Sequence, residues 1–230
     1  MQRGTFTFPV VSLAAGLVLL LSGCAATRST FDVPVARVEA ANPPAVAYVK
    51  LVGVTDKRVF EASPSSPSTP SLQKAEELRD PAITARAIAR KRGGFGNAMA
   101  DILLPEGRTV VQVVTEAITD ALRQQGYAVV ETGAPQYAAA IPLAVDIQQF
   151  WSWFTPGFWA ITIENESIVV LKSDPLFAGK EESVRGYASV NGMAATDGEW
   201  QRTMQLGVKD LVEKVKAKLP KPATVKTSQR

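Results

Sequence analysis

The stretch 141–171 reads IPLAVDIQQFWSWF (141–154), TPG (155–157) and FWAITIENESIVVL (158–171). Two runs rich in β-branched and aromatic residues flank a turn that contains proline and glycine, which is typical of a β-hairpin. In the first run Leu143, Val145 and Ile147 alternate with polar residues, so one face of this strand is predicted to be buried. The hairpin therefore predicts an antiparallel sheet as the base of the fold.

Two amphipathic helices are predicted, one before the hairpin over about Val110 to Gln125 and one after it that ends at Pro220. In each, apolar residues recur every three or four positions and build one stripe. Each begins with a capping-box pattern, and these are Thr109 with Gln112 and Thr196 with Glu199. Further strands are predicted at Val46–Val54, Tyr127–Glu131 and Glu182–Val190. This order predicts an α+β domain, with a mainly antiparallel sheet that carries two helices on one face.

The N-terminus has the pattern of an export signal. Arg3 precedes an apolar run from about Phe6 to Leu21, which is shorter than the ~20 residues that a membrane-spanning helix needs. The run ends in Leu21-Ser22-Gly23-Cys24, which resembles the lipobox of bacterial lipoproteins. The resemblance implies cleavage before Cys24 and acyl chains on its sulfur and its new amine. The alternative is an ordinary signal peptide with a cysteine there by chance.

The export signal predicts where the protein is located and where its mature chain begins. The residue directly after Cys24 is not aspartate. By resemblance to the sorting rule of lipoproteins, we therefore expect the protein at the periplasmic face of the outer membrane. We predict a signal peptide over 1–23, a lipidated N-terminus and flexible tether over 24–45, a periplasmic α+β domain over 46–219 and a disordered tail over 220–230. Within the domain, 61–108 is predicted to be a long irregular insertion. Its beginning is rich in serine and proline, and three glycines interrupt it near residue 95.

Composition excludes several function classes. The 230 residues include 25 basic and 22 acidic side chains, so the net charge of +3 gives no support for nucleic-acid binding. Histidine is absent, which removes the commonest general base. The single cysteine permits no internal disulfide and no cysteine cluster for zinc. We expect no metal and no cofactor other than the covalent lipid on Cys24.

Aromatic side chains gather around the hairpin turn. Trp151 and Trp153 are predicted on one face of the strand and Phe150 and Phe154 on the other, so not all of them can be core. The candidate partner-contact residues are Trp151, Trp153, Phe154, Phe158 and Trp159. The alternative is that these aromatics pack beneath the 61–108 segment.

Charged residues supply two further candidates. Arg90, Lys91 and Arg92 form a basic stretch that would contact anionic headgroups or cell-wall polymers, or else a solvated loop. Five carboxylates could instead serve an enzyme of cell-wall or polysaccharide metabolism, and these are Asp146, Glu164, Glu166, Glu181 and Glu182. Strand carboxylates usually face solvent, so we assign no catalytic residue and expect no enzyme.

Five features of the chain occur together: the Leu-Ser-Gly-Cys signal, an early valine-rich strand, Leu122–Tyr127, the strand with Asp146, and Arg185–Gly192 before the last helix. In these features the chain resembles the YajG family of outer-membrane lipoproteins. The chain departs from the family in 61–108 and in its tryptophan-rich hairpin tip. The resemblance implies location and fold rather than an activity. By analogy we expect a binding or accessory module for an envelope protein complex, peptidoglycan or another lipoprotein, or a purely structural spacer.

Overall fold

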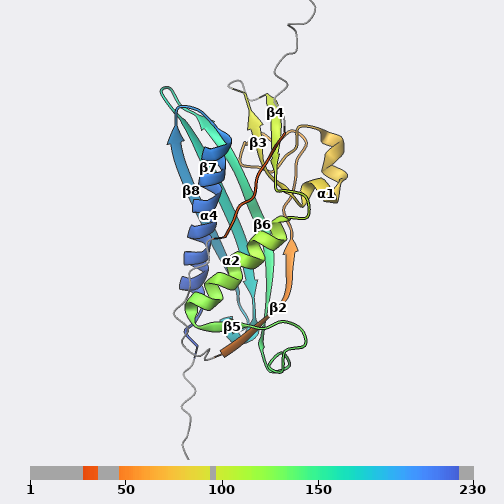
Figure 1. Ribbon diagram of the computed structural model, residues 1–230, viewed down its shortest axis with the longest axis vertical. Coiled ribbons are helices and arrows are strands. Elements are labelled where there is room, and N and C mark those ends of the chain that lie inside the picture. The colour runs from red at the N-terminus through yellow and green to blue at the C-terminus, as the bar shows by residue number, and fades with distance from the viewer. Residues whose placement is uncertain (1–27, 36–46, 94–96, 223–230) are drawn as a thin grey trace, which may run out of the picture.

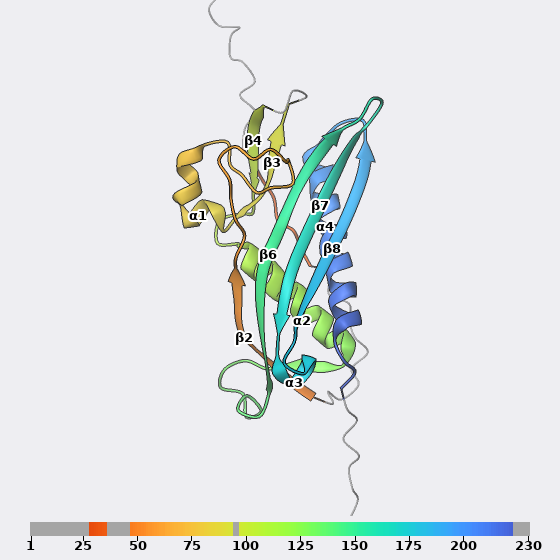
Figure 2. The same ribbon diagram turned by 180° about the vertical axis from the view of Figure 1, so that it is seen from behind.

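Eight strands form one sheet, and the two long helices both lie on one of its faces (Figures 1 and 2). This computed structural model describes residues 28–35, 47–93 and 97–222. The predicted signal peptide and Cys24 lie outside the described residues. The α+β class and the placement of both helices on one face are confirmed.

The predicted hairpin is present as β6 (Ile141–Pro156) and β7 (Ile161–Lys172), and β8 (Glu181–Gly192) continues the antiparallel ladder. The turn lies two residues later than predicted, because β6 extends through Pro156 and the amide of Gly157 donates to the carbonyl of Ala160 at 2.9 Å. The alternating residues of the first arm, which are Leu143, Val145 and Ile147, are buried as predicted.

The long strand β6 pairs with two further strands along the edge that β7 does not occupy. Its first half pairs in parallel with β2 (Ala47–Asp56), which also pairs in parallel with β5 (Tyr127–Val129). Its second half meets β3 (Ala87–Arg92), where Ala89 lies opposite Ser152. The sheet is therefore mixed, and its longest ladders are the antiparallel ones.

The segment 61–108 is more regular than the sequence predicts. It contains a 3-10 helix (Ala75–Arg79), α1 (Pro81–Thr84), β3 and β4 (Ala98–Leu103), and the last two form an antiparallel hairpin within the sheet. The prediction of an irregular insertion is therefore wrong for 87–92 and 98–103. The first three residues of β3 are all buried, so this strand lacks the alternation that marks a half-buried strand.

Both long helices begin where predicted. In α2 (Val110–Gln125) and α4 (Asp197–Lys218) the capping boxes at Thr109 and Thr196 are formed, with reciprocal hydrogen bonds at each. Gly126 ends α2 with φ 102°, a left-handed conformation that glycine adopts without strain. Local sequence therefore fixes the ends of both helices.

The predicted tail also begins in contact with the domain. The hydroxyl of Tyr127 donates to the carbonyl of Pro220 at 2.9 Å, and the side chain of Gln125 donates to the carbonyl of Leu219 at 2.7 Å. These bonds hold the chain against the end of α2, so the prediction of disorder is wrong for 220–222. Residues 223–230 lie outside the described residues.

Helix α4 approaches β8 so closely at Gly186 that a side chain there has no room. A Cβ at this position would lie 2.7 Å from the Cβ of Leu211 and 2.9 Å from its backbone nitrogen. We expect Gly186→Ala to lower the free energy of unfolding by about 1–3 kcal/mol through overpacking. The control is Gly53→Ala in β2, where nothing lies within 4 Å of the added carbon. Urea denaturation of both variants measures the difference, and equal losses would contradict this packing.

Candidate functional site

The described part of the predicted tether is bound to the domain. Residues 28–35, here called the N-terminal strap, include β1 (Ser29–Thr30), which pairs in parallel with β4. Arg28 forms ion pairs with Glu77 and, at 3.0 Å, with Asp101. The prediction of a flexible tether over 24–45 is therefore wrong for 28–35, because pairing and charge hold this segment in place.

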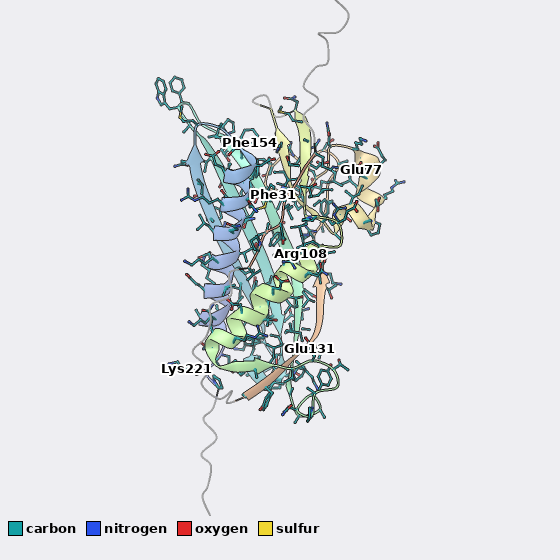
Figure 3. All side chains as sticks on the ribbon, viewed as in Figure 1. Phe31, Glu77, Arg108, Glu131, Phe154 and Lys221 are labelled. Atoms are coloured by element: carbon teal, nitrogen blue, oxygen red, sulfur yellow. The ribbon has the colours of Figure 1, made fainter. Side chains whose placement is uncertain are left out.

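Apolar and polar contacts hold the rest of the strap. Val33 is fully buried, and Phe31 and Val35 pack against the core formed under the two helices. Asp32 forms an ion pair with Arg108 at 3.1 Å. Figure 3 labels Phe31 and Arg108 on the helix-bearing side of the molecule. Only three residues separate the strap from Cys24 in the sequence.

The start of the strap meets the first residue of α4. Asp197 accepts hydrogen bonds from the hydroxyl of Ser29 at 2.9 Å and from the ammonium of Lys91 at 2.7 Å. Burial alone would raise the pKa of Asp197. The two hydrogen bonds and the charge of Lys91 lower it by more than burial raises it, so the pKa lies below its usual value. The cluster joins β1, β3 and α4 at one end of the molecule, which also carries the β6–β7 turn (Figure 1).

Two of the predicted contact residues belong to the core instead. Trp151 is fully buried and Trp153 is 9% exposed, and both pack with Leu72, Ala87 and Leu103. The partner-contact role is therefore wrong for both tryptophans, and the alternative of packing beneath 61–108 is correct for them. The physical reason is that this segment covers the sheet face opposite the helices.

Phe154 faces the other way and packs, half-buried, against the main core. Phe154 and the two tryptophans thus lie on opposite faces of β6, as the alternation predicts. Phe154 offers little surface to a partner.

The remaining two aromatics are exposed at the hairpin tip, which we define as residues 157–160. Phe158 is 90% exposed and Trp159 is 82% exposed. Their rings contact each other edge to face, with centroids 4.7 Å apart. The exposed aromatic surface is therefore this pair at the extreme end of the hairpin, which is smaller than the sequence predicts.

The predicted anion-contact residues do not form one free surface. Lys91 is bound to Asp197, and Arg92 donates to the hydroxyl of Ser71 at 3.3 Å. Burial, followed by the charge of Arg92, lowers the pKa of Arg90, and its Nε has no hydrogen-bond partner among the described residues. Successive residues of a strand point to opposite faces, so β3 separates Lys91 from the two arginines.

All five candidate carboxylates have partners. Glu164 accepts from the hydroxyls of Thr155 at 2.6 Å and Tyr187 at 2.7 Å, and the bond from Tyr187 raises the pKa of that phenol. Glu166 forms an ion pair with Arg185. The other three pairs are Asp146 and Glu181 with Lys172, and Glu182 with Lys218. A hydroxyl or a cation thus engages each of these five carboxylates, and none of them lines the groove between α2 and α4.

A groove that sequence analysis missed lies between α2 and α4. It has a volume of about 390 Å³, and its lining includes Asp120, Leu206 and Val212 together with Pro34 and Val35 of the strap. Three separate segments build it, so no local pattern could predict it. The structure marks the groove by Leu206, a large apolar residue of its lining that is 40% exposed.

The described residues contain neither a membrane-spanning helix nor a cluster of metal ligands. Among the described helices none is long and apolar enough to cross a bilayer. The same residues contain no group of three or more acidic or cysteine side chains that could hold a metal ion.

No family model and no curated protein sequence matches this chain. Among solved structures it is similar to protein XCC0632 from Xanthomonas campestris, of family DUF330, with 12% identity, a TM-score of 0.44, and coverage of 82% of this chain and 95% of that one. It is also similar to the hypothetical protein CT253 from Chlamydia trachomatis, with 10% identity, a TM-score of 0.36, and coverage of 74% and 94%. A candidate lipoprotein from Caulobacter crescentus shares 16% identity over 46% of this chain and 77% of its own, with a TM-score of 0.29.

Proposed function

We propose that this chain is an exported lipoprotein, acylated on Cys24 and held at the periplasmic face of the outer membrane. Its domain is a non-catalytic accessory module that binds an envelope component through the hairpin tip. The Leu21-Ser22-Gly23-Cys24 signal and the resemblance to the YajG family support the anchor and the location. The exposed Phe158 and Trp159 support binding.

One observation carries the proposal. Arg28, four positions after the cysteine of the lipobox-like motif, is already held by ion pairs, and a strand pairing holds the residues that follow it. A segment fixed so soon after the acylation site is suited to holding the domain close to a membrane. A purely structural spacer would share this anchor but would have no need for two exposed rings.

The alternative of a carboxylate enzyme has less support. A glycosidase needs one carboxyl group with a raised pKa and a second group across a substrate cleft. Here Glu164 accepts a hydrogen bond from Tyr187, and Glu166 forms an ion pair with Arg185. A binding module requires no such pair.

Acylation is tested by Cys24→Ser in the producing bacterium. We expect the wild-type protein to incorporate labelled palmitate and to sediment with the outer membrane, and the variant to lose all label. Ser22→Ala is the matched control, because it keeps a small residue before the cysteine and should be labelled normally. A Cys24→Ser protein that is still cleaved after Gly23 and stays membrane-bound would contradict the proposal.

A further inference from the structure

We propose that the hairpin tip inserts into the headgroup region of the bilayer that holds the acyl chains of Cys24. The inference rests on the proposed function, and it names the lipid bilayer itself as the component that the tip contacts. Phe158 and Trp159 then form a second attachment point beside the lipid anchor.

The fold brings the tip and the start of the strap to the same end of the domain. Ile161, the residue after the tip, pairs with Gly192 at the end of β8. Five residues later Asp197 holds Ser29, at the start of the strap. Figure 1 shows the turn of β6 and β7 at the end where β3 and β4 meet, and Figure 3 labels Lys221 at the opposite end.

The short connection limits how far this end can stand from the membrane. Cys24 and Arg28 are four positions apart, so a fully extended chain between them spans at most ~14 Å. The acylated cysteine must lie at the bilayer surface, because its chains are buried in the hydrocarbon. The strap end of the domain is therefore kept near the headgroups, and the tip at that end is brought to them.

The chemistry of the tip suits an interface between water and hydrocarbon. No charged residue occurs from Phe154 to Ile163, so insertion removes no charge from water. The bond between Gly157 and Ala160 satisfies one amide and one carbonyl of the turn. Tryptophan is enriched at membrane interfaces, where its ring is buried and its N–H stays hydrated.

A third exposed apolar side chain lies beside the tip. Met193 is 86% exposed and follows Gly192, which pairs with the first residue of β7. Three apolar side chains on two neighbouring turns form a narrow convex surface. Stable protein interfaces bury roughly 800 Å² on each partner, so a bilayer fits this small surface better than a protein does.

Tryptophan fluorescence tests the insertion selectively. Trp151 and Trp200 are fully buried, Trp153 is 9% exposed and Trp159 is 82% exposed, so quenchers that act on contact report mainly on Trp159. The acylated full-length protein is reconstituted in vesicles of phosphatidylethanolamine and phosphatidylglycerol, with or without bromine on the acyl chains. We expect brominated lipid to quench Trp159 and the bilayer to reduce its quenching by aqueous acrylamide about threefold or more. Trp159→Phe should abolish both effects.

Vesicle retention after removal of the anchor gives a second measurement. The protein is cleaved from its acyl chains at a protease site introduced between Cys24 and Arg28, and the released fraction is followed. We expect Phe158→Ser with Trp159→Ser to weaken the residual binding about tenfold or more, because each large ring buries substantial apolar area. Val59→Ser is the matched control, since Val59 is 71% exposed and follows by two positions Lys57, whose amide donates to the carbonyl of Ile147 in β6 at 2.8 Å.

The outcomes separate the two proposals. An unacylated Cys24, seen by mass spectrometry of the N-terminal peptide, contradicts both. An acylated, vesicle-bound protein in which acrylamide still reaches Trp159 freely overturns the insertion and leaves the lipoprotein assignment standing. Crosslinking from position 159 in cells that captures one protein in high yield, and little lipid, would likewise overturn the insertion in favour of a protein partner.

Discussion

Replacing Trp151 with alanine should lower the free energy of unfolding by about 3–5 kcal/mol. The indole is fully buried, contacts the ring of Phe60 edge to face at 5.9 Å, and donates its N–H to the carbonyl of Pro67 at 3.3 Å. These contacts fasten the segment after β2 to the sheet face opposite the helices. The substitution leaves a large cavity between that segment and β6, which neighbouring side chains cannot fill.

Trp159→Ala is the matched control for this substitution. The same residue type is removed eight positions along the same hairpin, but from a site that is 82% exposed. Its effect on the free energy of unfolding should stay within about 0.5 kcal/mol. Urea denaturation followed by circular dichroism measures both. If Trp151→Ala proved as mild as Trp159→Ala, the packing of Trp151 beneath the 61–108 segment would be wrong.

Arg58→Ala should destabilise the fold by a similar amount, about 3–5 kcal/mol. The Arg58 side chain is completely buried and pairs with Asp56 at 2.7 Å. It also donates to the carbonyls of Thr84, Ala87 and Phe150 at 2.8, 2.6 and 3.2 Å. The guanidinium thus joins the end of β2 to β3 and β6. Alanine would leave the Asp56 carboxylate without its cation and three carbonyls without this donor.

Two further variants isolate the role of this guanidinium. Lys57→Ala removes the neighbouring exposed cation and should change the free energy of unfolding by less than about 0.5 kcal/mol. Arg58→Lys keeps the charge but loses the planar fork, so we expect an intermediate loss. Limited proteolysis should cut Arg58→Ala first between residues 60 and 86, because that segment loses its attachment. Equal stability of the Arg58→Lys and wild-type proteins would show that charge alone is sufficient.

The elements with strong local signals could be predicted from the sequence. The capping boxes at Thr109 and Thr196 fix the helix starts because each bond joins residues three positions apart. The alternation in 141–147 predicts the buried face of β6 because Leu143, Val145 and Ile147 pack in the core formed under the two helices. In these cases the determinants lie within a few residues of the feature, and the prediction needs no knowledge of the tertiary structure.

The site depends on partners that are distant in sequence. Trp151 and Trp159 lie in one aromatic run, and only the position of the segment that includes Leu72 makes one of them core and the other surface. Arg58 stands at a polar strand end, and nothing nearby indicates that its partners are the carbonyls of Ala87 and Phe150. The docking of the N-terminal strap likewise depends on Asp101 and Asp197, which no pattern within 28–35 reveals.

The parallel pairings at the start of the chain have a consequence for the order of folding. Arg28 and Asp101 are 73 residues apart, whereas β6, β7 and β8 are joined in succession by short connections. Pairings between distant segments form slowly because a long loop must first close. If the chain crosses a membrane with its amino end first, β1 and β2 emerge before β4, β5 and β6, which are the strands they pair with, have crossed. The segments nearest the proposed lipid anchor would be the first to emerge and the last to become ordered.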